Sequence, residues 1–128
     1  MPTCSGTEMA VRWQSGLHHP VSVYAKQVVR GRLHDQCCPY EIKACQRHLD
    51  DLKRQGSDDF PYVFDATRAD RIIRWFGQCI QVRGVEQREA IQLQPWQVFD
   101  LGCTYGWVHK DTGARRFKRT YNKRARGN

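Results

Sequence analysis

Apolar residues recur at helical spacing in four stretches of the chain. In the first stretch they are Val21, Tyr24, Ala25 and Val28. Because an α-helix makes one turn about every 3.6 residues, this spacing places them on one face of a helix. Pro20 suits the first turn of such a helix, and Gly31 suits the position just beyond its end. The pattern therefore predicts a first helix that begins at Pro20 and stops near Gly31.

The second stretch has the most regular pattern. Its apolar positions follow one another at alternating steps of four and three residues, namely Cys38, Ile42, Cys45, Leu49 and Leu52. Charged and amide side chains occupy the positions between them, so the pattern predicts an amphipathic helix with one buried stripe. Pro39 fits its first turn and Gly56 its end. We place Asp50 and Asp51 on its polar face.

The third stretch follows a short aromatic segment, residues 60–64, which Pro61 keeps extended. Asp65 is a good N-cap for the helix that comes next. The apolar positions of this helix are Ala69, Ile72, Ile73, Phe76 and Ile80. We expect the helix to end at Gly84. We also expect it to pack on the second helix, with Ile72, Ile73 and Phe76 against Ile42, Cys45 and Leu49.

The fourth stretch is shorter, and two strand-like segments follow it. Pro95 suits the first position of a helix, and Gly106 interrupts the helical pattern. The segments after it, which suit a β-hairpin, are Trp107–Lys110, a turn at Asp111–Gly113, and Arg116–Tyr121. The expected fold class is mainly α, with three to four helices followed by a β-hairpin. This order looks like the lead-in to an α/β sheet whose remaining strands are absent.

Length and composition narrow the class of protein. The chain has 128 residues, of which 40% are hydrophobic and 27% charged, as in a soluble globular domain. No stretch approaches the ~20 apolar residues of a membrane helix. Residues 1–6 have neither the basic nor the apolar region of a signal peptide. A membrane protein and a secreted protein are both disfavoured, and the cytoplasm is the expected location.

The six cysteines are expected to be reduced thiols, because no secretory signal precedes them and four occupy apolar positions of helical patterns. Cys45 and His48 are three residues apart on a helix and could be drawn as zinc ligands. No Cys-x-x-Cys pair accompanies them, so we expect no metal site. The histidines are scattered and the paired carboxylates lack further ligands, so no catalytic set is visible either.

The positive charge is concentrated at one end of the chain. The net charge is +8, and residues 112–128 hold seven basic side chains and no acidic one. The other positions hold 14 basic and 13 acidic residues, since the totals are 21 and 13. A basic segment of this kind favours phosphate, from a nucleotide or a nucleic acid. A solvated basic tail is an equally weighted alternative.

From Pro20 onward the chain resembles the N-terminal part of the terminase large subunit of tailed phages and prophages. The resemblance covers about the last 108 residues and rests on the order and spacing of several blocks. These blocks are Phe60–Asp65, Arg71–Arg74, Leu93–Gln97, Gly106–Gly113 and Arg115–Phe117. The resemblance implies an α/β P-loop NTPase that packages viral double-stranded DNA, with ATP and Mg²⁺ as cofactors. It also implies that the whole protein has an endonuclease domain and works in the cytoplasm of the host cell. Its partners there would be the viral DNA, a terminase small subunit and a portal.

The resemblance also suggests which residues bind nucleotide. Gln97 would recognise adenine, with Trp96 as its apolar or stacking neighbour. The first half of a Walker A loop would be Arg124, Ala125, Arg126, Gly127 and Asn128. The Gly-Lys-Ser/Thr of such a loop is not among the 128 residues. We therefore expect a fragment truncated inside this loop, inactive alone and without tight nucleotide binding.

The expected organisation has three parts: a loose segment at 1–18, a helical lead subdomain at 19–92, and the incomplete start of an ATPase domain at 93–128. Two other interpretations stay open. One is a small basic helical module that binds nucleic acid, although no helix gathers Arg, Asn and Gln on one exposed face. The other is an interaction domain that docks on another subunit.

Overall fold

The helices begin where proline and capping residues place them. The computed structural model describes residues 16–32, 37–79 and 90–123. In order, its elements are α2 (Pro20–Val29), α3 (Pro39–Arg54), β1 (Tyr62–Phe64), α4 (Ala66–Gly77), α5 (Pro95–Gly106) and β2 (Trp107–His109). Proline stands at the start of α2, α3 and α5, where its missing N–H costs nothing. The predicted starts of these three helices are confirmed.

The start of α4 is also confirmed, but its predicted end is wrong. The Asp65 carboxylate accepts hydrogen bonds from the backbone N–H groups of Thr67 at 3.0 Å and Arg68 at 3.3 Å. The helix ends at Gly77 instead of continuing to Gly84. The N–H of Cys79 bonds to the carbonyl of Phe76, three residues back, which closes the last turn more tightly than an α-helix does. Ile80 and Gly84 lie outside the described residues.

The two strands pair with each other, although 42 residues separate them in sequence. They form a two-stranded antiparallel sheet in which Phe64 lies opposite Trp107 and Tyr62 opposite His109. The predicted hairpin is therefore only partly right. The chain does turn back after β2, with the N–H of His109 bonded to the carbonyl of Ala114 at 2.8 Å. Instead of a strand at Arg116–Tyr121, the return side keeps one bridge, between Val108 and Arg115.

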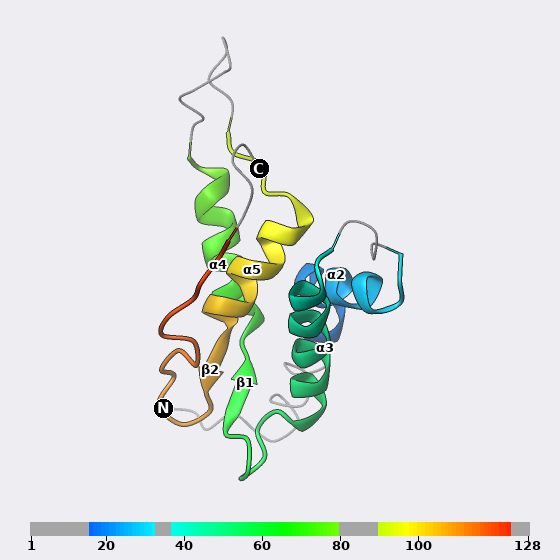
Figure 1. The fold of residues 1–128 in the computed structure, drawn as a ribbon. Coiled ribbons are helices and arrows are strands. Elements are labelled where there is room, and N and C mark those ends of the chain that lie inside the picture. The colour runs from blue at the N-terminus through cyan, green and yellow to red at the C-terminus, as the bar shows by residue number, and fades with distance from the viewer. Residues whose placement is uncertain (1–15, 33–36, 80–89, 124–128) are drawn as a thin grey trace.

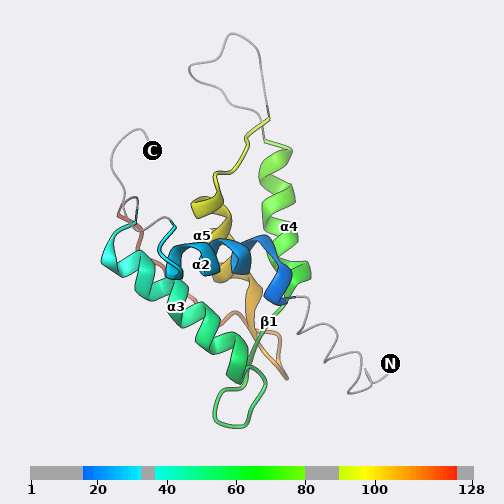
Figure 2. The same ribbon diagram turned by 90° about the vertical axis from the view of Figure 1, so that its right-hand side faces the viewer.

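The helices form two pairs, which Figure 1 shows on opposite sides of the molecule. One pair is α4 and α5, the other is α2 and α3, and α2 also lies against α5. Figure 2 shows α2 crossing α5 with α3 and α4 on either side. The predicted packing of the third helix on the second is wrong. The hydrophobic pattern indicates an apolar face on each helix, but it does not indicate which helix packs against that face. In the structure Ala69 of α4 is buried against α5, while Ile72, Ile73 and Phe76 are half-buried.

One core joins these elements, and aromatic rings dominate it. Phe64 of β1, Phe99 of α5 and Trp107 of β2 are all buried and surround the imidazole of His48 from α3. Core residues thus come from both sides of the predicted boundary between residues 92 and 93. His19, which sits at the edge of the segment expected to be loose, is buried and caps α2 by accepting from the N–H of Val21 at 3.3 Å.

Candidate functional site

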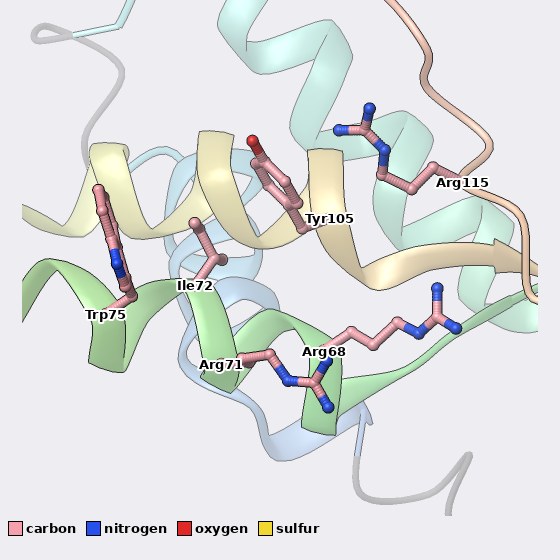
Figure 3. Close-up of a pocket in the computed structure, with 6 residues that line it drawn as sticks. All are labelled: Arg68, Arg71, Ile72, Trp75, Tyr105 and Arg115. Atoms are coloured by element: carbon pink, nitrogen blue, oxygen red, sulfur yellow. The ribbon is translucent and has the colours of Figure 1, made fainter.

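An open cleft of about 490 Å³ lies where α4, α5 and the turn after β2 meet. Three arginines, two aromatic residues and one isoleucine line it: Arg68, Arg71, Ile72, Trp75, Tyr105 and Arg115. Figure 3 shows the arginines towards one end of the cleft and Trp75 at the other, with Ile72 and Tyr105 between them. The cleft therefore has a cationic end and an aromatic end.

The geometry of α4 accounts for four of these side chains. Residues 68, 71, 72 and 75 are three, four and seven positions apart, so they share one face of the helix. Tyr105 reaches the cleft from the last turn of α5, and Arg115 comes from the return side of the turn. Sequence reasoning missed this site because it followed the apolar positions of α4 and assigned no binding role to its arginines. The i, i+3, i+4, i+7 spacing of Arg68, Arg71, Ile72 and Trp75 was the signal that could have found it.

Arg68 fixes the turn against α4. Its Nη1 donates a hydrogen bond to the carbonyl of Gly113 at 2.6 Å, and its Nε lies 3.9 Å from the Asp65 carboxylate. Gly113 has a φ of +70°, which favours glycine, and a Cβ there would lie 3.1 Å from the Arg68 guanidinium. The Nδ1 of His109 accepts from the N–H groups of Asp111 and Thr112 and closes the same turn. Arg115 is thereby held on the wall opposite Arg71.

The other two arginines of the cleft keep their charge available. Within the described residues, neither Arg71 nor Arg115 forms an ion pair with a carboxylate. The Arg115 guanidinium lies over the Tyr105 ring, 5.1 Å from its centroid. Trp75 is 55% exposed, which is high for the largest apolar side chain. The arrangement suits a ligand that carries both negative charge and a flat apolar surface.

The residues that the resemblance assigned to adenine lie elsewhere. Gln97 sits in the first turn of α5, where its Oε1 accepts a hydrogen bond from the backbone N–H of Gln94 at 2.8 Å. Trp96 is partly buried and packs against the core. Neither lines the arginine cleft. The residues expected to begin a Walker A loop, Arg124 to Asn128, lie outside the described part of the chain.

A second groove lies between α5 and the last described residues. It measures about 320 Å³, and Arg47 of α3 and Phe99 and Thr104 of α5 face the segment 119–122 across it. Residues 119–122 therefore run beside α5. Trp96 and Gln97 do not line this groove.

Part of the basic C-terminal segment is bound to the body of the protein. Arg116 donates from Nη1 to Asp51 Oδ2 at 2.6 Å, and Arg54 bonds to Oδ1 of the same carboxylate at 2.7 Å. The Arg116 guanidinium also lies within 6 Å of the Phe60, Tyr62, Trp107 and Phe117 ring centroids. The prediction that Asp51 lies on a polar face is wrong, since its side chain is 2% exposed. Asp51 can be buried because Arg116, which is distant in sequence, neutralises the charge of its carboxylate.

His48 is a buried polar side chain that hydrogen-bonds to several other residues of the core. Its Nδ1 lies 3.0 Å from the indole Nε1 of Trp107, which can only donate a hydrogen bond. Nδ1 is therefore the acceptor, and the ring proton resides on Nε2, which donates to Ser22 Oγ at 2.9 Å. Ser22 in turn donates to the carbonyl of Gly16. Burial lowers the pKa of His48 to about 4, which keeps the ring neutral.

This histidine and serine have a structural role. Ser22 is fully buried and His48 nearly so, and a substrate cannot reach either. The cysteines nearby are equally inert, since burial raises the pKa of Cys45 to about 12 and that of Cys103 well above its usual value. The described cysteines are all free thiols. No group of three or more potential metal ligands occurs within the ranges that the structure describes.

No helix in the described part of the chain is both long and apolar enough to cross a bilayer. Comparisons with protein-family models, with curated proteins and with solved structures found no significant match to this chain. The assignment of a function therefore rests on the residues and their geometry.

Proposed function

We propose that this chain forms the leading part of a terminase large subunit of the tailed-phage type, the ATP-driven motor that packages double-stranded DNA. The observation that carries the proposal is the meeting of the blocks on which the resemblance rests. The Phe60–Asp65 block pairs with the Gly106–Gly113 block through β1 and β2. The N–H of Asp65 bonds to the carbonyl of Gly106 at 2.7 Å.

The same blocks hold one another through their side chains. Arg68, just after the first block, donates to Gly113 at the end of the second, and Arg116 from the Arg115–Phe117 block lies over Phe60 and Tyr62. These contacts link segments that lie more than 40 residues apart in the sequence. Their mutual contacts support the interpretation that they form one inherited structural unit.

In the proposed motor, ATP would bind between the segment around Gln97 and the loop that begins at Arg124. Gln97 keeps two N–H donors on its amide and a second lone pair on Oε1, enough to pair with the N7 and N6 positions of adenine. The residues that grip the β- and γ-phosphates and Mg²⁺ in such motors are not among these 128. We expect no ATP hydrolysis by this chain alone.

The nucleotide sequence after the codon for Asn128 gives the most direct test. The proposal predicts codons for Gly-Lys-Ser or Gly-Lys-Thr within a few positions, in the same frame or in a shifted one. Unrelated sequence in all frames would contradict the proposal and would favour an independent module.

A protein that continues through those codons allows a test of Gln97 itself. Gln97→Glu keeps an oxygen that can accept from Gln94 and removes the amide donors, so α5 should stay capped. We expect the KM for ATP to rise about tenfold because the adenine contact is lost. Gln92→Glu, an exposed residue before α5, makes the same charge change as a control. An equal effect of both variants would contradict adenine recognition by Gln97.

A further inference from the structure

The arginine cleft between α4 and α5 is separate from the Gln97 segment, and its chemistry points to a ligand of its own. We propose that it binds a nucleoside phosphate, with the phosphate at the end of the cleft that the arginines line and the base against Trp75. The ligand is either a free nucleotide or an unpaired nucleotide of a single strand. This inference does not depend on the motor assignment.

The cationic end suits a phosphate. A guanidinium offers two parallel N–H donors that match two phosphate oxygens, and Arg71 and Arg115 have no carboxylate partner in the described residues. Among the residues that the structure describes, no acidic side chain lines the cleft. The carboxylate of Asp65, which lies near the lining residue Arg68, is occupied as the N-cap of α4. A negatively charged ligand would thus meet a site with unbalanced positive charge.

The aromatic end suits a base. Trp75 leaves more than half of its surface in solvent, and its ring meets that of Phe76 edge-on, 5.0 Å between centroids. Ile72 and Tyr105 continue the apolar surface from Trp75 towards the arginines. Base–aromatic stacking of this kind tolerates any base, because every base has a π-face.

The shape of the cleft favours a single nucleotide over a duplex. Its volume of about 490 Å³ lies in the range of sites for small ligands. Bases in a duplex are stacked and cannot lay a face on Trp75 without leaving the helix. The walls are also fixed in advance, since Arg68 ties the turn that carries Arg115 to α4. A prearranged site of this size loses little freedom when a ligand binds.

Binding to the full chain can be measured by fluorescence anisotropy with a fluorescein-labelled oligothymidylate. Arg71→Gln and Trp75→Ala should each weaken binding about tenfold, since each removes one half of the recognition. Arg74→Gln is the matched control, because Arg74 is exposed on the same helix and outside the cleft. It removes the same charge and should weaken binding less than about twofold. Circular dichroism should be unchanged in all three variants.

Competition separates the possible ligands. Inorganic phosphate, thymidine or a duplex at the same concentration should not displace the oligonucleotide, whereas thymidine monophosphate and an unlabelled strand distinguish the two possible ligands. If the mononucleotide competes as well per nucleotide as an unlabelled strand, the free nucleotide is the ligand; if only the strand competes, the site reads single-stranded nucleic acid. Equal losses for Arg71→Gln and Arg74→Gln, no loss for Trp75→Ala, or no binding would overturn the proposal.

Discussion

At the scale of single residues, His48 makes the fold sensitive to pH. Burial is the main cause of its lowered pKa, and the nearby His19 and Arg47 lower it further, while the Asp51 carboxylate opposes them. The pKa of His48 is about 4 in the folded protein, whereas an unperturbed histidine, as in the unfolded chain, has a pKa of 6.5. The unfolded chain therefore binds a proton that the folded protein excludes between these two values.

Stability should accordingly fall as the pH is lowered from about 6.5 to about 4. The shift corresponds to a loss of about 3 kcal/mol in the free energy of unfolding attributable to His48. Urea denaturation across this pH range measures it. The same series on His48→Gln isolates the effect, because the variant has no imidazole to titrate. An identical pH dependence in both proteins would show that other groups are responsible.

The two adjacent aspartates of α3 allow a comparison at the same scale. Asp51 is buried and pairs with Arg116 and Arg54, whereas Asp50 is exposed. Asp51→Ala leaves the partly buried Arg116 without its counterion and should cost about 3 kcal/mol of stability. Asp50→Ala should change it by less than about 0.5 kcal/mol. Thermal unfolding of both variants provides the measurement, and similar melting temperatures would contradict the role given to the Asp51–Arg116 pair.

At the scale of elements, glycines set how closely α5 approaches its neighbours. A Cβ at Gly102 would collide with Cγ2 of Val21 on α2, and one at Gly106 would lie 2.6 Å from the Phe64 ring. Both glycines are buried, and Ala69 of α4 faces the same stretch of α5. The tight crossing of α5 with α2 and α4 thus depends on the absence of side chains at these positions.

Gly102→Ala should therefore destabilise the protein by about 2 kcal/mol, because the helices must move apart or strain. Gly77→Ala is the control, since a Cβ there has no atom within 4 Å. It should be neutral or stabilise α4 by up to about 1 kcal/mol, in line with helix propensity. Chemical denaturation compares the two. A Gly102→Ala protein as stable as the parent would mean that Val21 can give way.

The elements also show what the sequence could and could not predict. Local periodicity was enough for α2, α3 and α5 and for the cap of α4 by Asp65, because these depend on neighbours in the chain. The pairing of β1 with β2 and the burial of Asp51 depend on partners far away in sequence, which a local pattern does not contain. Trp96 and Gln97 were placed correctly on a helix, yet whether they read a nucleotide stays a prediction.

At the scale of the whole molecule, the shared core predicts cooperative unfolding. Phe99 and Trp107 from one predicted domain pack around His48 and Phe64 from the other. We expect tryptophan fluorescence and far-UV circular dichroism to report a single coincident thermal transition. Two separated transitions would instead support an independent segment after residue 92.

The attachment of Arg116 has a consequence for everything downstream of it. A basic tail joined by a flexible linker would sample many positions and would meet a binding partner in any orientation. In this protein the ion pair with Asp51 and the surrounding aromatic rings hold Arg116 in place. The chain continues from Arg116 along the groove beside α5. Residues that follow Arg116 therefore leave the body of the protein from a fixed position and in a fixed direction.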